Sequence, residues 1–358
     1  MRNYFFFRTF APMINKEVLI IGGGPAGAMC GYLMKKAGID CLVIDHATFP
    51  REKICGGGLT PKCWHLLDQL MPDLEYPYNP VNHLRIMLNG QPGCEFDAEE
   101  ELRIVKRKEF DNLLLERYKK EGGDFRKDSP KAIQELEDGK ILVTLHSEET
   151  VTCRYLVGAD GTNSFVRRYL TGRRDLGILA MEQYMDKGIY DKTNDVVVGL
   201  STQYDKGGYF YKFPTNEFDV VGYGDWSTSA ERFSQVLRDM SIPEQKFRGA
   251  YICQTNDYPL RDNIILIGDA GGFANRLTCE GIYDAFKTAR NAVTAIVEKQ
   301  PFKEVNSSIF AKMKRQEKLA NRFFSKPGFA LLRLMCHFPS TVKFFYDIKM
   351  KRETFTKA

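Results

Sequence analysis

The sequence predicts an α/β protein, α+β overall, with a parallel sheet, an inserted antiparallel sheet and a helical C-terminal region. Short, wholly apolar runs that lead into glycine-rich loops are typical of strands buried on both faces of a parallel sheet. Such runs lie at 18–21, at 151–157, where Thr152 and Arg154 interrupt the run, and at 264–267. Between the last two, alternating polar and apolar residues indicate antiparallel strands, and from Lys303 onwards apolar residues recur at helical spacing.

The first of these runs opens a strand, helix, strand unit. After the strand at 18–21, small and apolar residues at 26–37 predict a helix that Gly38 ends. A second buried strand follows at 41–44 and ends at Asp45. Because both strands should lie in one parallel sheet, we expect a right-handed crossover between them.

A glycine motif joins this strand to this helix. It reads Gly22-Gly23-Gly24-Pro25-Ala26-Gly27, a GxGxxG pattern. Gly22 permits the tight turn, Gly24 lets the backbone approach a pyrophosphate, and Gly27 lets the helix pack closely on the strand. The helix N-terminus offers N–H groups to a phosphate, and Asp45 stands where an acid accepts hydrogen bonds from a ribose. The motif predicts a bound dinucleotide; the alternative is a glycine-rich turn without one.

The rest of the chain divides by its periodicity. Before residue 172 the patterns predict helices at 61–70 and 108–121 and strands at 84–88, 102–105, 141–145 and 151–157. After it they predict antiparallel strands at 196–200, 209–213 and 220–223, a helix at 229–240, a buried strand at 264–267 and a long helix at 281–298. We expect a discontinuous nucleotide-binding domain (14–80, 100–171 and 255–300), a substrate domain (81–99 and 172–254) and a C-terminal helical region (301–358).

The composition narrows the class of protein. A net charge of +5 over 358 residues is modest, and we expect no nucleic-acid partner. The nine cysteines lack the spacing of a zinc site or a redox dithiol, so we expect reduced cysteines, no metal site and a cytoplasmic protein. No apolar run approaches the roughly 20 residues of a membrane-spanning helix, and residues 1–12 lack the pattern of a signal peptide.

Two further loops that combine glycine and aspartate follow buried strands. One is Gly158-Ala159-Asp160-Gly161, and the other begins Gly268-Asp269-Ala270. Each places an acid at the carboxyl end of a strand, where open α/β sheets bind their ligands. A single Asp-Gly pair is usually a turn, but three strand-end loops in one chain indicate one shared ligand site.

The three loops together resemble the motifs of flavoproteins with the para-hydroxybenzoate hydroxylase fold, over roughly residues 16–300. The resemblance implies a Rossmann-type domain that binds FAD. It implies that Asp269, after Gly268, hydrogen-bonds the ribityl chain of FAD. It also implies that Asp160 and Gly161 lie near the pyrophosphate and that Asp160 helps to order the site.

Two helix starts extend this resemblance. The segment Arg107-Lys108-Glu109-Phe110-Asp111 is similar to the family's Arg-x-x-Phe-Asp helix start, which implies that Arg107 contacts FAD. Gly281 and Ile282 open the helix after the third loop. By the same resemblance they give backbone N–H groups to the flavin pyrimidine ring, and the helix end stabilises negative charge on the reduced flavin.

A loop at 49–61 resembles one family more closely. It reads Phe49-Pro50-Arg51-Glu52-Lys53-Ile54-Cys55-Gly56-Gly57-Gly58-Leu59-Thr60-Pro61, similar to the Pro-Arg-x-Lys-x-Cys-Gly-Gly-Gly loop of geranylgeranyl reductases. The run 208–214 is similar to their Gly-Tyr-x-Trp-x-Phe-Pro strand. The resemblance implies an FAD-dependent reductase that transfers hydride from reduced flavin N5 to a C=C bond of a prenyl chain or prenyl lipid. NAD(P)H or another donor would reduce the flavin.

The candidate catalytic residues are Cys55, Tyr209 and Tyr211. Cys55 faces the flavin or the substrate in this interpretation, and the alternative is a small buried thiol. The two tyrosines are candidates for proton delivery or substrate positioning. An unactivated alkene needs a dry, shaped cavity more than a strong acid–base pair, so few polar catalytic residues are expected.

The loop also holds candidate cofactor contacts. Arg51 and Lys53 bind an FAD phosphate or a substrate diphosphate, or else lie in a solvated loop. Cys55, Gly56 and Gly57 let the backbone pass close to the isoalloxazine, because glycine brings no side chain to clash with it.

The sequence departs from the reductase pattern at three positions. Tyr211 stands where the family usually has Trp, Arg276 where Pro is expected, and Cys279 where Gly is expected. Two alternatives therefore stay open, a flavin-dependent monooxygenase of the same fold and a lipid-binding flavoprotein without turnover. A Trp-x-Trp-x-x-Pro run, typical of flavin halogenases, is absent from the sequence.

The region after Lys303 is rich in basic and aromatic residues, and Pro327 and Pro339 should interrupt its helices. One interpretation is peripheral docking on the inner membrane face, which would deliver a lipid substrate. The other is a helical cap packed on the core, with its basic residues in water. The sequence does not reveal the oligomeric state.

Overall fold

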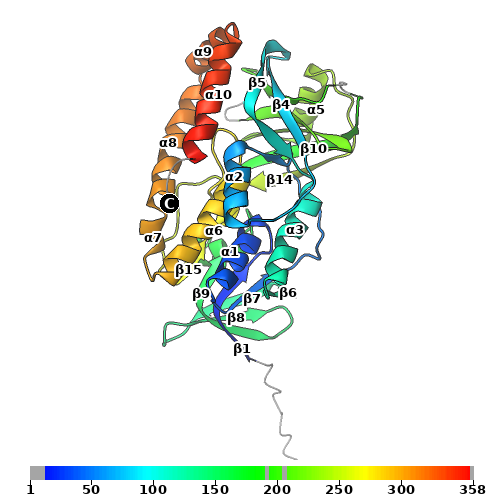
Figure 1. The fold of residues 1–358 in the computed structure, drawn as a ribbon. Helices are drawn as coiled ribbons and strands as arrows, with labels where there is room; N and C mark the ends of the chain where they lie inside the picture. The colour runs from blue at the N-terminus through cyan, green and yellow to red at the C-terminus, as the bar shows by residue number, and fades with distance from the viewer. Residues whose placement is uncertain (1–12, 190–192, 204–207, 355–358) are drawn as a thin grey trace, which may run out of the picture.

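The computed structural model describes residues 13–189, 193–203 and 208–354. The prediction about residues 1–12 falls outside this part of the chain. The chain forms two β-sheets flanked by helices, and helices α8 to α10 line one side of the molecule (Figure 1). The predicted mixed α/β fold class is confirmed.

The first sheet is parallel at its centre. Its strand order is β6-β2-β1-β9-β8-β7, and β15 also pairs with β9. The parallel strands are β1 (Met13–Ile21), β2 (Cys41–Asp45), β6 (Asp124–Lys127), β9 (Thr150–Gly158) and β15 (Ile264–Leu266). β7 (Pro130–Glu135) and β8 (Ile141–Leu145) continue the sheet as an antiparallel hairpin. The sequence patterns miss β6 and β7, which are short and largely polar.

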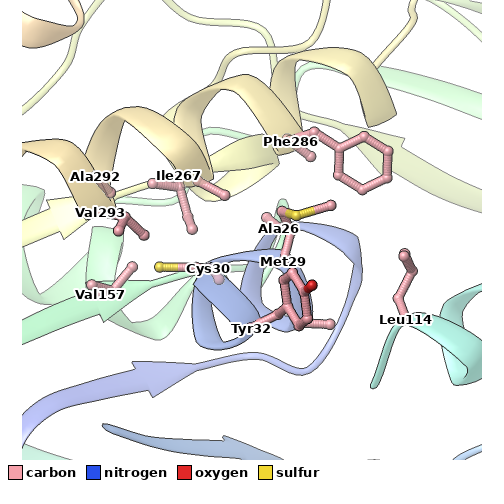
Figure 2. Packing of buried hydrophobic residues seen from close by; sticks show 14 of the residues in the cluster. Ala26, Met29, Cys30, Tyr32, Leu114, Val157, Ile267, Phe286, Ala292 and Val293 are labelled. Carbon is pink, nitrogen blue, oxygen red and sulfur yellow. The ribbon is translucent and has the colours of Figure 1, made fainter. Parts of the chain in front are cut away.

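Alternate residues of the central strands belong to two hydrophobic cores on opposite faces of the sheet. Val18 and Ile20 lie in a cluster with α1 (Pro25–Lys36), α3 (Arg107–Lys120) and α6 (Ile282–Val297), whereas Leu19 and Ile21 lie in a cluster on the opposite face. This alternation explains why the strands read as continuous apolar runs. Figure 2 shows the first core, where side chains of α1 and α6 pack together above the sheet.

The second sheet has the order β14-β10-β13-β12-β11-β4-β5-β3. Its strands are β3 (Gly58–Leu59), β4 (Asn79–Leu88), β5 (Gln91–Ile104), β10 (Ile178–Asp186), β11 (Val196–Leu200), β12 (Tyr209–Pro214), β13 (Phe218–Asp225) and β14 (Phe247–Ile252). β4 and β5 form one long hairpin, and β11 pairs with β4 in parallel. The sequence predicts only the last part of each strand of this hairpin, at 84–88 and 102–105, and it misses β10 and β14.

The two faces of the second sheet have different neighbours. Phe210 and Tyr223 face a cluster with α5 (Ala230–Asp239). Tyr211 and Phe213, which alternate with Phe210 along β12, point to the other face. Phe213 there joins an apolar cluster that includes residues of β4, β5 and α10. The sheet thus offers an aromatic face toward the loop at 49–61, because the position of a Cβ on Gly56 would lie 2.2 Å from the Phe213 ring.

The C-terminal region is helical, as predicted. It consists of α7 (Phe302–Val305), α8 (Ser307–Phe323), α9 (Lys326–Cys336) and α10 (Pro339–Thr354), and the two prolines lie in the first turns of α9 and α10. α10 packs on α2 (Pro61–Leu70) and on β5. The sulfur atoms of Cys94 on β5 and Cys336 on α9 are 3.3 Å apart. No helix in the described ranges is both long and apolar enough to span a bilayer.

We expect Gly27→Ala to prevent folding. An added Cβ would lie 1.8 Å from the Gly22 carbonyl oxygen, a backbone atom that cannot move without displacing β1. Gly38→Ala is the matched control. Gly38 has a positive φ of 74°, which strains an alanine, but nothing lies within 4 Å of its Cβ position. The cost should therefore be only about 1–2 kcal/mol.

Thermal unfolding and yield of soluble protein measure both variants. A well-folded Gly27→Ala protein with a melting temperature near that of Gly38→Ala would contradict the packing described for α1.

Candidate active site

The three glycine-rich loops meet at one edge of the first sheet. Ile21 pairs with both Ile44 and Gly158, and Gly158 pairs with Leu266, so the central strands end at the same level. The backbones are in direct contact there, because a Cβ on Gly22 would lie 2.3 Å from the Ala159 carbonyl oxygen. The three predicted loops therefore form one site, as the carboxyl ends of parallel strands should.

The first loop presents backbone rather than side chains. Gly24 is the N-cap residue of α1, and no side chain caps this helix. Its first-turn N–H groups are therefore available to an anion. Asp45 holds the loop in place, because its carboxylate accepts hydrogen bonds from the backbone N–H groups of Gly23 at 2.7 Å and Ala47 at 2.8 Å.

Two arginines flank this loop and share one carboxylate. Arg107 donates to Asp111 at 2.7 and 2.9 Å, and both side chains are buried. Burial opposes the charge of Arg107, but Asp111 holds the pKa of Arg107 above its ordinary value. Arg51 lies 3.5 Å from the same carboxylate, and its guanidinium is 3.1 Å from the Cβ position of Gly24. The cluster keeps one net positive charge beside the helix N-terminus.

The second loop is ordered by Asp160. Its carboxylate accepts hydrogen bonds from the Ser164 hydroxyl at 2.5 Å and from the backbone N–H groups of Phe165 at 2.6 Å and Val166 at 3.3 Å. It thereby caps α4 (Phe165–Thr171). Burial raises the pKa of Asp160, although these hydrogen bonds favour its charged form. Gly161, the next residue, has a φ of 74°.

The third loop brings Asp269 to the N-terminus of α6. Gly268 begins a short 3₁₀ turn with a φ of 55°, and Asp269 follows it. An Asp269 oxygen lies 3.1 Å from the Cβ position of Gly281, the N-cap residue of α6, which also lacks a side-chain cap. Burial raises the pKa of Asp269, whereas Lys53 and Arg107 lower it, so both cations lie close to this carboxyl. Ile282 is the first residue of the helix.

The glycines at 56 and 57 are required by the chain's own packing. The Cβ position of Gly57, whose φ is 73°, lies 2.0 Å from the Val105 carbonyl oxygen. That of Gly56 faces the rings of Phe213 and Tyr211. The close approach that the sequence predicts toward an isoalloxazine ring is therefore, on this side of the loop, an approach of Gly57 to Val105 and of Gly56 to β12.

A buried acid that the sequence analysis misses ties this loop to β12. Glu182 on β10 is 2% exposed. It accepts hydrogen bonds from the Tyr211 hydroxyl and from the backbone N–H of Cys55, both at 3.0 Å. Burial raises the pKa of Glu182. The signal available in the sequence is an acid within the largely apolar run at 178–186, but the sequence patterns do not predict β10 as a strand.

The two candidate tyrosines are hydroxyl donors here. The Tyr209 hydroxyl donates to the Thr278 carbonyl oxygen at 2.5 Å, and the Tyr209 and Tyr211 ring centres are 6.2 Å apart. Burial raises the pKa of both tyrosines well above the ordinary value; Cys279 and Glu182, respectively, add to the effect. Both hydroxyls therefore keep their protons and cannot act as bases near neutral pH.

The segment before α6 carries two of the noted departures. Cys279 has a φ of 53°, a left-handed conformation that favours glycine, which explains why Gly is the expected residue there. Arg276 donates to the Gln254 carbonyl oxygen at 3.2 Å. Glu280 accepts a hydrogen bond from Thr60 at 2.5 Å and pairs with Lys62 at 2.7 Å, so this segment is anchored to the loop at 49–61.

Comparison with known proteins identifies the family. The family model of an FAD binding domain matches residues 15–232. The chain belongs to this FAD-binding family. An uncharacterized protein of Methanosarcina barkeri is 30% identical to this FAD-binding protein over 307 residues, which cover 79% of the present chain and 75% of the relative.

Two relatives have names that state a reaction. The chloroplastic geranylgeranyl diphosphate reductase of Arabidopsis thaliana is 27% identical over 313 residues, covering 79% of this chain and 66% of that protein. The menaquinone reductase of Mycobacterium tuberculosis is 29% identical over 313 residues, covering 78% and 76%. The predicted resemblance to geranylgeranyl reductases is confirmed, and the protein is an FAD-binding oxidoreductase.

Solved structures share the fold. A geranylgeranyl bacteriochlorophyll reductase-like protein of Thermoplasma acidophilum has a TM-score of 0.69 and 19% identity, covering 96% of this chain and 93% of that one. A flavin-dependent brominase has a TM-score of 0.71 and 17% identity, covering 95% and 93%. At these identities the likeness shows the fold alone, and the fold does not decide between a reductase and a monooxygenase.

We expect Glu182→Gln to change how stability depends on pH. The pKa of Glu182 is raised in the folded state, so its contribution is fully present below the ordinary glutamate pKa. That contribution is lost as the pH rises through the raised value. The stability of the native protein relative to Glu182→Gln should therefore fall with increasing pH.

Melting temperatures measured from pH 4 to pH 8 test this expectation. Glu137→Gln makes the same chemical change at an exposed position and is the control. A difference between the native protein and Glu182→Gln that does not change with pH would contradict the burial effect.

Proposed function

We propose that this protein is an FAD-dependent reductase that adds hydrogen across a C=C bond of a prenyl chain or prenyl lipid. One observation carries the proposal. The aromatic face of β12 at Cys55 continues through Phe213 into an apolar cluster between the second sheet and α10, with Leu84, Val196 and Val342 among its members. Buried apolar side chains of this kind suit the lining of a site for a long hydrocarbon chain.

The names of two relatives support this substrate class. Geranylgeranyl diphosphate is a prenyl diphosphate, and menaquinone is a quinone with a prenyl side chain. Reductases that carry these names align with more than three quarters of this chain. The substitution of Tyr211 for the usual Trp keeps an aromatic ring at the aromatic face.

The glycine-rich edge fits FAD. We propose that the backbone of Gly22–Gly27 and the uncapped N-terminus of α1 bind the pyrophosphate, with Arg51 beside them and Asp45 at the adenosine ribose. Asp269 would bind the ribityl chain, and the N-terminus of α6 at Gly281 would face the flavin ring. A Cβ at Gly22 or Gly27 would overlap backbone atoms, and one at Gly24 or Gly281 would lie 3.1 Å from Arg51 or Asp269.

Once reduced, bound FAD would supply the hydride for one alkene carbon, and we propose NAD(P)H as the donor of the two electrons that reduce it. The chain's own residues do the rest. The apolar cluster excludes water and aligns the alkene. The other carbon needs a proton, and the buried group formed by Tyr211, Glu182 and Cys55 is placed to hold one. Glu182 with a raised pKa is a better reservoir than the tyrosine hydroxyls.

The test is anaerobic turnover with a panel of prenyl substrates. The FAD-loaded protein, NADPH or dithionite, and either prenyl diphosphates or prenylated lipids should give products that are heavier by two mass units per reduced bond. Under air, the monooxygenase alternative predicts substrate-dependent oxygen uptake and a product heavier by sixteen. Oxygenated product, or no reduced product with any donor, would overturn the proposal.

Two substitutions test the proton-holding group. We expect Tyr211→Phe and Glu182→Gln to lower kcat about tenfold to a hundredfold, within the range for a lost proton-transfer group, while FAD content stays unchanged. Tyr223→Phe removes a hydroxyl from the opposite face of the sheet, where Tyr223 donates to Asp225. It should therefore keep kcat.

Turnover per bound FAD and its pH profile are the measurements. If Tyr211→Phe and Tyr223→Phe turn over equally fast, Tyr211 takes no part in the reaction.

A further inference from the structure

The C-terminal helices expose apolar residues on the side that faces away from the core. On α9, Leu331 and Leu334 are 57% and 59% exposed, and Phe338, at the corner before α10, is 60% exposed. Leu332 and Cys336 of the same helix are buried. At 100° per residue the exposed side chains form one stripe on the side opposite the buried pair.

α10 repeats this arrangement. Val342 and Met350 are buried, whereas Phe344 and Phe345 are 59% and 57% exposed. At helical spacing, the two phenylalanines point away from the buried side. Several large apolar side chains exposed on two adjoining helices are unusual on a soluble protein and mark an interaction surface.

Basic residues accompany these side chains. Residues 303–354 contain 12 Lys and Arg but 4 Asp and Glu, so this region is more positive than the chain as a whole, whose net charge is +5. Lys314, Lys318 and Arg322 are exposed and follow one another at four-residue spacing along α8. Within the described ranges, none of these three pairs with a carboxylate. Leu319, 53% exposed, lies on the same side of the helix.

We propose that this basic–apolar surface, formed by Lys314, Lys318, Arg322, Leu331, Leu334, Phe338, Phe344 and Phe345, docks the protein on an anionic lipid bilayer. Lysine and arginine are attracted to anionic headgroups while apolar side chains enter the interface. The same charge disfavours a second copy of this chain as the occupant, because two such surfaces would repel each other.

Docking at this surface would bring a prenyl substrate to the apolar cluster beside the site. This step rests on the proposed function. The inner side of α10 contributes Val342 and Tyr346 to the apolar cluster that reaches Phe213. Tyr346 packs on Phe96 of β5, with ring centres 5.6 Å apart. A prenyl chain that leaves the bilayer beside α10 meets this cluster directly. Figure 1 shows α9 and α10 next to the β4–β5 hairpin and away from the β7–β8 end of the first sheet.

Vesicle co-sedimentation of the full-length FAD-loaded protein tests docking without any substrate. We expect sedimentation with vesicles of phosphatidylglycerol and phosphatidylcholine, weakened by salt, and little with phosphatidylcholine alone. Lys314→Gln/Lys318→Gln/Arg322→Gln should weaken binding roughly a hundredfold, about fivefold per charge. Leu331→Gln/Leu334→Gln/Phe338→Gln should weaken it at least as much.

The matched control is Lys127→Gln/Lys131→Gln/Lys140→Gln, which removes three exposed charges from the first sheet and should bind vesicles nearly as well as the native protein. Absence of vesicle binding, equal binding to both vesicle types, or no effect of either C-terminal variant would overturn the proposal. So would a change from dimer to monomer in these variants without any vesicle binding, because the surface would then be a contact between copies.

Activity measured in parallel separates this proposal from the proposed function. Both C-terminal variants should reduce a detergent-dispersed prenyl substrate as fast as the native protein but lose activity on the same substrate in vesicles. A native protein that binds anionic vesicles and reduces nothing would leave docking standing and overturn the reductase. A native protein that reduces prenyl substrates but does not bind vesicles would overturn docking and leave the reductase standing.

Discussion

Close backbone contact at the edge of the first sheet is the constraint on which the rest of the structure depends. The Gly22 Cα faces the Ala159 carbonyl, and the Gly27 Cα faces the Gly22 carbonyl, at distances that exclude any side chain. Because β1, β9 and β15 end at one level, the three loops must share a small space. This sharing creates a site lined by backbone N–H groups and helix N-termini, which suits a phosphate-bearing cofactor.

The polar groups around that edge are paired in ways that hold its loops and helix ends in place. Asp111 holds Arg107 and lies near Arg51, Asp160 caps α4, and Glu182 links β10 to the backbone of Cys55. A buried acid on one sheet thereby fixes a loop that crosses to the other. The two sheets meet through hydrogen bonds as well as through apolar packing, and the unpaired alternative would be costly for buried groups of this kind.

The sequence patterns predict the parts of the fold in which one residue type repeats at a fixed spacing. The strands at 18–21, 41–44 and 264–267 are buried on both faces, so every residue is apolar. The helix at 61–70 is found with its observed bounds. The prediction misses most of β5 because that part of the strand is rich in acidic and exposed residues. The sequence patterns do not predict the role of Glu182, because its hydrogen-bond partners are 29 and 127 residues away in the sequence. No local pattern spans such a distance.

The pairing of the strands also determines when each strand can find its partner during synthesis. β1 takes its place beside β9, whose residues come more than 130 positions later, and β15 completes that edge only after residue 266. β4 likewise waits for β11. During synthesis the nascent chain therefore carries unpaired apolar strands until about three quarters of it has emerged, and such strands invite aggregation. A chain that stopped before residue 264 would lack β15 and would leave Leu156–Gly158 of β9 without their outer partner.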